Sequence, residues 1–204
     1  MKLLKIIFSL LLGCSAYVGD YVVFKSELSN SFVLRAIFDN IIHGTIGFFS
    51  ALAFYSHESN LNMKTCIMNV LICTSVSCLI DIDHFLVAKS FHLKDLSNLK
   101  QRGIFHNTTC WTLLSVLLLL YSYHFRNINV LILNCMVILA FSSHHIRDAN
   151  RRGLWIYPLG HSPAIDKHLY VLLLMVLPHC IAWFCSISKE HLRVNIEYTH
   201  INTV

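Results

Sequence analysis

Asp81, Asp83 and His84 follow one another closely at the end of an apolar run, residues 66–80. Carboxylates and an imidazole are costly beside hydrocarbon, so such a cluster at the end of a membrane span is a candidate functional site. Aspartate oxygens and a histidine nitrogen are also ligands that Zn²⁺, Mn²⁺ or Fe²⁺ accepts. The alternative is that the helix ends here and its polar residues mark the contact with water.

A second group of polar residues lies inside the apolar run at residues 32–54. Arg35, Asp39 and His43 recur at every fourth position, and this spacing places them on one face of a helix. An ion pair between Arg35 and Asp39 would neutralise both charges without any further function. That alternative does not account for His43, which lies near the middle of the run.

The later apolar runs also begin or end with residues that can bind a metal. His106 comes just before a run at residues 110–123, and His144 and Asp148 follow a run at residues 128–143. His144 and Asp148 are four positions apart, so they point the same way on a continued helix. The eight cysteines form no C-x-x-C pair, so neither a thiolate zinc site nor a disulfide framework is indicated.

The composition indicates the class of protein that holds these residues. Of 204 residues, 55% are hydrophobic and 13% are charged, whereas about a quarter are charged in soluble domains. The net charge of +5 is spread along the chain without a basic run, so no nucleic-acid partner is indicated. The composition therefore predicts a multi-pass membrane protein whose main partner is the lipid bilayer.

The apolar runs predict an all-α membrane protein, a bundle of about six transmembrane helices. Long runs without alternation favour helices, because inside a membrane only helices or closed barrels satisfy the backbone. We expect a single transmembrane domain at residues 1–187 and a polar C-terminal tail at residues 188–204. A cleaved signal peptide remains an alternative for the first run. The expected spans are residues 6–24, 32–54, 66–80, 110–123, 128–143 and 168–187.

Following the chain through six spans brings the polar motifs together. The loop at residues 85–105 and the loop at residues 145–167 fall on the same side of the membrane, and the second span starts from that side. Unrelated polar residues would fall on both sides, so this convergence favours one shared site. The residues expected near that membrane face are Arg35, Asp39, Asp81, Asp83, His84, His106, His144 and Asp148, with His43 deeper.

Several motifs of this chain occur together in a known family: Arg35-x-x-x-Asp39-x-x-x-His43, Asp81-x-Asp83-His84-Phe85, His106, Ser143-His144-His145-Ile146-Arg147-Asp148 and Gly153-Leu154-Trp155-Ile156-x-Pro158-x-Gly160. With these motifs the sequence resembles the transmembrane protein 267 family of animals. The resemblance covers most of the chain, and that family has no established activity, so it implies a membrane protein without implying a reaction.

A looser resemblance reaches the LexA-regulated, membrane-bound metal-dependent hydrolase family of bacteria. The chain departs from that pattern where Ile80 replaces a proline, Gln101 a histidine and Asn107 a serine. Glutamine binds metals poorly, so Gln101 places catalysis in question. The residues that fall on the pattern are His43 with Gly47, Asp81, Asp83, His84, Arg102, Gly103, His106, Ser143, His144 and Asp148.

This second resemblance implies a divalent metal such as Zn²⁺ or Mn²⁺ and hydrolysis of a lipid or phosphoester in or near the bilayer. Asp83 would orient a ligand or act as a base. Arg102 and Arg147 would clamp an anionic group such as a phosphate, with Arg35 and Asp39 in support. The implied metal ligands are His43, Asp81, His84, His106, His144 and Asp148.

Two other functions stay open at the level of the sequence. The cluster could be structural in a membrane protein without catalytic activity, and the replacement at Gln101 favours that alternative. The polar face of residues 35–43 could belong to a transporter or proton relay. Transporters often show internal repeats and broken helices, and the sequence shows neither, so this alternative ranks last.

Overall fold

The computed structural model describes residues 2–58, 62–92, 99 and 102–201. In these residues the chain is almost entirely helical, as predicted. The α-helices are α1 (Lys2–Lys25), α2 (Phe32–Tyr55), α3 (Met63–Leu79), α4 (Asp83–Ala88), α6 (Thr108–His124), α7 (Ile128–Arg152) and α8 (Lys167–Ile201). Short elements join them: the 3₁₀ turns η1 (Glu27–Asn30), η2 (Ile80–Ile82) and η3 (Ile104–His106), and the strands β1 (Trp155–Ile156) and β2 (Gly160–His161).

Six of the described helices are long, and five segments are long and apolar enough to cross a membrane: α1, α2, the α3–α4 segment, α7 and α8 to Leu192. The remaining helix, α6, has 17 residues, somewhat fewer than the ~20 that a bilayer core requires. These helices confirm the predicted multi-pass membrane protein.

Two helices extend beyond the apolar runs. The fifth run was expected to end at residue 143, but α7 continues to Arg152. Likewise, residues 188–201 continue α8. Hydropathy marks the part of a helix that meets hydrocarbon, whereas backbone hydrogen bonds continue into the polar segment that follows. The extension of α7 matters for the site, because His144 and Asp148 lie on this continued helix.

Asparagine side chains mark the start of three helices. Asn62, Asn107 and Asn127 each accept hydrogen bonds from backbone N–H groups in the first turn of α3, α6 and α7. Such caps satisfy donors that a helix leaves without partners. Asn107 stands where the bacterial pattern has a serine, and as the cap it starts α6 at Thr108, two residues after His106.

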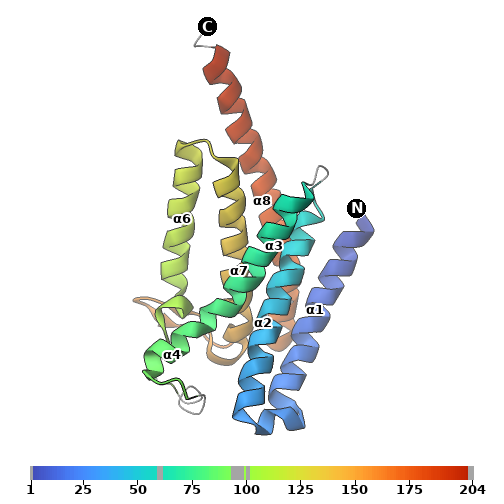
Figure 1. The fold of residues 1–204 in the computed structure, drawn as a ribbon, viewed down its shortest axis with the longest axis vertical. Coiled ribbons are helices and arrows are strands. Elements are labelled where there is room, and N and C mark those ends of the chain that lie inside the picture. Colours follow the sequence, from blue (N-terminus) through green and yellow to red (C-terminus); the bar gives the residue numbers. More distant parts are fainter. Residues whose placement is uncertain (1, 59–61, 93–98, 100–101, 202–204) are drawn as a thin grey trace.

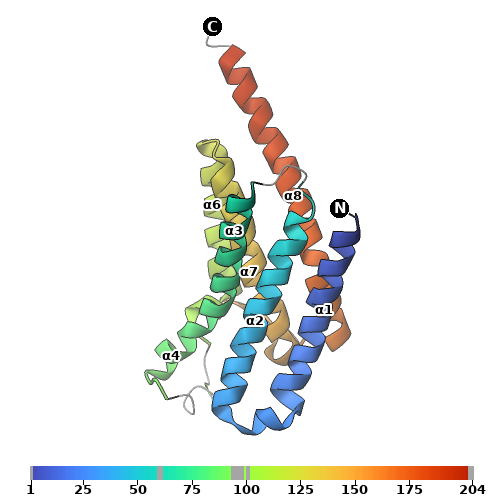
Figure 2. The ribbon, with the colours of Figure 1, turned by 45° about the vertical axis from the view of Figure 1, so that its right-hand side comes forward.

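The bundle is organised around α7. This helix packs against α2, α3, α6 and α8, while α1 packs against α2 and α8. The apolar core includes Phe54, Leu131, Met136 and Leu139, which are almost fully buried. The turn between α1 and α2, α4 and the β1–β2 hairpin all lie toward the end of the bundle opposite the C-terminus (Figures 1 and 2). The polar residues gather in this part of the bundle, as predicted from the direction of the spans.

A break in the third span separates the polar residues that follow it. The α-helix ends at Leu79 and the chain makes the 3₁₀ turn η2 before α4 begins at Asp83. Because side chains three positions apart eclipse in a 3₁₀ turn, Asp81 and His84 lie on the same side. Asp83 instead faces η3. The break therefore allows two neighbouring carboxylates to serve different partners.

Candidate metal centre

Four side chains from three segments bring donor atoms to one point. Asp81 comes from η2, His106 from η3, and His144 and Asp148 from α7. One donor atom from each lies within 4.8 Å of the others. Both histidines are almost fully buried, at 2% and 1% exposure. The structure thus gathers four of the six implied metal ligands.

The spacing of these donors suits a tetrahedral ion. His106 Nε2 lies 3.4 Å from Asp81 Oδ1, 3.4 Å from Asp148 Oδ2 and 3.2 Å from His144 Nε2. His144 Nε2 lies 3.4 Å from Asp81 Oδ1 and 3.9 Å from Asp148 Oδ2. With zinc–ligand bonds of about 2.0–2.1 Å, neighbouring ligands in a tetrahedron lie about 3.3–3.4 Å apart. Five donor pairs therefore lie near this spacing, and the carboxylate oxygens of Asp81 and Asp148 lie within 4.8 Å of each other.

Hydrogen bonds on the far side of each imidazole determine what faces the centre. His144 Nδ1 lies 3.0 Å from the Ser77 carbonyl oxygen, and His106 Nδ1 lies 3.1 Å from both carboxylate oxygens of Asp83. These oxygens only accept, so each Nδ1 carries the hydrogen. In the neutral rings both Nε2 lone pairs then face each other across 3.2 Å. Such an arrangement requires a cation or a proton between them.

Asp83 orients this arrangement rather than facing the open site. Its carboxylate also accepts hydrogen bonds from the backbone N–H groups of Phe105 and His106, at 2.9 and 3.3 Å. The side chain is 1% exposed. A carboxylate behind a ligating histidine is the usual outer partner of a metal site, where it fixes the tautomer and the ring orientation.

His43 lies next to the four donors. Its ring stacks on His144 with centroids 3.7 Å apart, and its Nε2 lies 3.5 Å from Asp148 Oδ1 and 4.0 Å from Asp81 Oδ2. Neither ring nitrogen makes a hydrogen bond with a described residue. A buried imidazole without hydrogen bonds is unfavourable, so His43 has an unused donor or acceptor beside the centre.

His84 lies at the edge of the cluster and is partly exposed. Its Nδ1 is 3.1 Å from the Asp81 carbonyl oxygen, 3.4 Å from Asp81 Oδ1 and 3.6 Å from Asp83 Oδ1. With Asp83 and His106 it forms a second group that could hold an ion. It does not belong to the four-donor group, although the resemblance implies that it is a ligand.

Two glycines of the bacterial pattern permit the close packing that forms the site. A Cβ at Gly47 would overlap Ser77 Oγ and lie 3.2 Å from the Cys73 carbonyl oxygen, so α2 approaches α3 closely at this point. A Cβ at Gly103 would overlap the Asp83 carboxylate. Gly47 therefore brings His43 close to the end of α3, and Gly103 brings η3 onto Asp83.

Arg147 does not lie where the resemblance implies. From the sequence we expect it to clamp an anion, but it is 1% exposed. Its guanidinium pairs with Asp20 at 3.2 Å and with Asp39 at 2.7 Å, and Tyr170 donates a hydrogen bond to Asp20. The expectation is wrong because two carboxylates already neutralise this buried charge. The arginine instead joins α7 to α1 and α2.

The simple ion pair between Arg35 and Asp39 does not form either. Asp39 pairs with Arg147, and Arg151 Nη2 lies 3.7 Å from Asp39 Oδ2. The Arg35 guanidinium lies over the Phe24 ring, 5.0 Å from its centroid. Asp39 and His43 both contact α7, as expected for two residues on one helix face, whereas Arg35 contacts α1.

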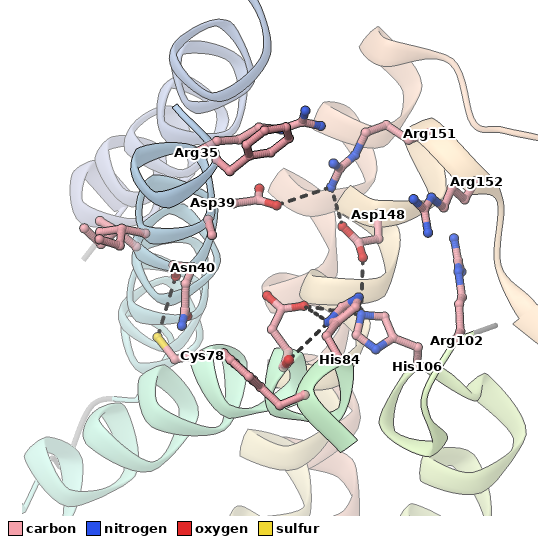
Figure 3. Close-up of a pocket in the computed structure, with 16 residues that line it drawn as sticks. Arg35, Asp39, Asn40, Cys78, His84, Arg102, His106, Asp148, Arg151 and Arg152 are labelled. Carbon is pink, nitrogen blue, oxygen red and sulfur yellow. Dashed lines mark hydrogen bonds and ion pairs between the residues drawn. The ribbon is translucent and has the colours of Figure 1, made fainter. Parts of the chain in front are cut away.

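An open pocket of about 560 Å³ lies beside the four donor side chains. Figure 3 shows the Arg151 guanidinium between Asp39 and Asp148, and Arg152 and Arg102 on the side of Asp148 that faces away from Cys78 and Asn40. Arg151 pairs with Asp148 at 2.8 Å, and Arg102 donates to the Gly153 carbonyl oxygen at 2.9 Å. Arg102 was expected at the site, whereas Arg151 and Arg152 were missed. Their position one turn beyond Asp148 on the same helix was the available signal.

The electrostatics of η3 and the loop before it agree with this geometry. Burial lowers the pKa of His106, but hydrogen bonds with Asp148, Asp81 and Asp83 outweigh burial and raise it to about 11. The three carboxylates therefore favour a positive charge on or beside the His106 imidazole, and either a proton or a metal ion can supply it. Gln101, which replaces a histidine of the bacterial pattern, lies outside the described residues.

Comparison with known proteins identifies the family. The chain is 31% identical over 196 residues to transmembrane protein 267 of Mus musculus, covering 95% of this chain and 89% of that protein. It is 32% identical over 178 residues to the Danio rerio protein of the same name, covering 86% of this chain and 76% of that protein. No family model and no solved structure matches. The chain therefore belongs to the transmembrane protein 267 family.

Proposed function

We propose that this protein is a metal-dependent hydrolase that acts on an ester at the membrane face. One observation carries the proposal. The Nε2 atoms of His106 and His144 lie 3.2 Å apart, each with its Nδ1 beside an acceptor, and two carboxylates lie around them. Lone pairs and negative charges that converge in this way are the features of a divalent cation site.

Asp81, His106, His144 and Asp148 would hold the ion, which we propose to be Zn²⁺ or Mn²⁺. An ion of this kind polarises a carbonyl or phosphoryl oxygen and makes water a nucleophile near neutral pH. The pocket beside the ligands gives a substrate access to this position, because Asp81, His106 and Asp148 all line it.

Three further side chains have distinct roles in the proposal. Asp83 is a positioning residue that acts through His106. His84 lines the pocket, and with its Nδ1 directed at the Asp81 carbonyl oxygen its Nε2 is available to transfer a proton. His43 lies inside the bundle next to Asp148 and His144, and it would stabilise these two ligands from that side.

The first experiment measures metal in the detergent-purified protein. We expect about one zinc or manganese ion per chain in the wild type and none in the Asp81→Ala/His144→Ala double variant. The matched control is His57→Ala/His179→Ala, which removes two histidines at the other end of the bundle and should keep the ion. Circular dichroism checks that each variant is helical. Wild-type protein that retains no metal after growth and purification with zinc and manganese would refute the proposal.

The second experiment tests hydrolysis itself. The metal-loaded protein is given a panel of carboxylic esters, phosphomonoesters and phosphodiesters that carry alkyl chains. We expect turnover of one class, loss of turnover in Asp81→Asn, and recovery when metal is restored after chelation. Stoichiometric metal without turnover of any class would favour the alternative of a structural ion in a protein without catalytic activity.

A further inference from the structure

The pocket carries a charge pattern that indicates the class of substrate. Four arginines and three aspartates line it, which gives a net charge of +1 with neutral histidines. A divalent ion on the Asp81 and Asp148 side would raise this charge to +3. A phosphomonoester carries a charge of about −1.5 to −2 at neutral pH, so this group compensates most of the excess. A neutral ester leaves the excess in place.

The arginines that line the pocket offer further guanidinium N–H donors to a ligand. In the described part of the chain, neither Arg35 nor Arg152 forms an ion pair with a carboxylate, and Arg102 donates to a carbonyl oxygen. Burial lowers the pKa of Arg102, Asp148 opposes this, and the positive charges of Arg152 and Arg151 lower it further. Like charges held together in this way favour an anion between them. Guanidinium groups also match the oxygens of a phosphate in a bidentate arrangement.

The other wall of the pocket is apolar and continues onto the outer surface of α2. Phe32, Ile37 and Ile41 line the pocket, yet they are about half exposed, at 50%, 48% and 51%. On a helix that crosses a membrane, such side chains face hydrocarbon. An alkyl chain could therefore pass from the bilayer along α2 while its polar end reaches the arginines.

We propose that the pocket binds an amphiphilic phosphomonoester, with the phosphate between the metal centre and the arginines and the alkyl chain along α2. This inference rests on the proposed hydrolase function, for which it names the substrate class. It places the phosphorus–oxygen ester bond next to His84. Hydrolysis there would transfer the phosphoryl group to water and release an alcohol that keeps the alkyl chain.

The test measures binding by the shift in the unfolding temperature of purified protein, with metal present and after chelation. Four probes separate the phosphate from the chain: dihexanoyl phosphatidic acid, dihexanoyl phosphatidylcholine, glycerol 3-phosphate and inorganic phosphate. We expect the strongest stabilisation by dihexanoyl phosphatidic acid. The phosphodiester lacks the second charge, and the two soluble phosphates lack the chain. Equal stabilisation by glycerol 3-phosphate and phosphatidic acid would indicate a soluble phosphate ligand and would overturn the lipid part of the proposal.

Two arginine variants test the phosphate contact. Arg152→Gln and Arg35→Gln should each weaken binding of dihexanoyl phosphatidic acid about tenfold, because each removes a charge-assisted contact. The control Lys64→Gln removes an exposed cation at the start of α3, remote from the pocket, and should bind as the wild type does. Unchanged affinity in both arginine variants would overturn the assignment of the phosphate to these arginines.

One variant on α2 tests the path of the chain. Ile37→Ser should weaken binding of dihexanoyl phosphatidic acid and leave glycerol 3-phosphate unchanged. Ile67→Ser on α3 is the matched control, since Ile67 is similarly exposed, at 54% against 48% for Ile37, and does not line the pocket. Loss of affinity in both variants, or in neither, would contradict a chain along α2.

Binding and turnover can fail separately. Phosphatidic acid that binds through the arginines but is not hydrolysed by the metal-loaded protein would support the binding site and refute the hydrolase. Metal-dependent turnover of a neutral ester without a preference for phosphate would support the hydrolase and refute this inference.

Discussion

Histidines gather at both ends of the bundle, but the two clusters differ in what their nitrogens face. At one end, His106 and His144 direct Nε2 atoms at each other and at two carboxylates. At the other end, His57 Nε2 lies 2.7 Å from His179 Nδ1, and no carboxylate bonds to either ring among the described residues. α2 connects the clusters, since it carries His43 and ends shortly before His57.

The second cluster closes on itself. Ser9 Oγ donates to the Lys5 carbonyl oxygen at 2.8 Å, so it accepts from His179 Nε2 at 2.7 Å. His179 Nδ1 then accepts from His57, and His57 Nδ1 accepts from the Lys5 ammonium at 3.0 Å. These contacts form a closed ring of hydrogen bonds through Lys5, His57, His179 and Ser9. Every imidazole nitrogen in this hydrogen-bond ring has a partner while both imidazoles are neutral. Histidines alone therefore do not indicate a metal site; unsatisfied lone pairs that converge with carboxylates do.

The largest expected contrast between the clusters is in metal affinity. His106→Ala removes one of four donors, so affinity should fall by more than the ~10–100-fold that loss of an outer partner causes. His179→Ala should leave the metal affinity unchanged, because the His179 imidazole has no free lone pair. Metal content after dialysis against graded chelator concentrations measures both variants. Equal retention of metal by the two variants would contradict the inference that only the cluster with His106 binds metal.

The outer partner of His106 should have a smaller effect. Asp83→Asn keeps the size of the side chain but removes the charge that holds His106 Nδ1–H, so metal affinity should fall about 10–100-fold. Ser9→Ala is the matched change in the ring, where it removes the acceptor for His179, and should not alter metal binding. The same chelator titration measures both. A large loss of affinity in Ser9→Ala would mean that the two ends are coupled through the bundle.

The packing of α2 on α3 gives the next contrast. In Gly47→Ala the new methyl group would overlap Ser77 Oγ and press on the α3 backbone, and such overpacking costs about 1–3 kcal/mol. In Gly13→Ala the methyl group meets the flexible end of Met175, with Sδ at 2.7 Å, and a methionine can move away at little cost. Thermal unfolding of both variants in the same detergent compares them. An equal decrease would show that α2 and α3 separate easily, against the close packing inferred for the site.

Much of the site could be predicted from the sequence because helix periodicity and span direction carry the information. The spacing of His144 and Asp148, and the end of the third span at Asp81, were enough to bring these side chains to one face. The outcome for Arg147 could not be predicted. Its partner Asp20 lies 127 positions away on α1, and a single carboxylate in an apolar run does not indicate which buried cation it faces.

The division of roles between Asp81 and Asp83 was also beyond the sequence. Both residues match the ligand chemistry, and only the 3₁₀ break at η2 turns Asp81 toward the four-donor cluster and Asp83 toward His106 Nδ1. Hydropathy does not mark such a break. The capping of α6 by Asn107, by contrast, accounts locally for a position where the chain departs from the bacterial pattern.

The smallest expected effect concerns the pH dependence of the closed ring. Burial lowers the pKa of His57 below its reference value, and Lys5 and His179 lower it further. A histidine with a lowered folded-state pKa binds fewer protons in the folded state than in the unfolded state. Its contribution to stability is therefore full above the reference pKa of about 6.5 and is lost as the pH falls below it.

Protonated His57 can no longer accept a hydrogen bond from Lys5, so the stability difference between wild type and His57→Gln should shrink as the pH falls from about 7.5 to about 5.5. Unfolding temperatures of both proteins across this range measure the difference, and a difference that grows toward acid pH would mean that the ring binds a proton rather than excluding one.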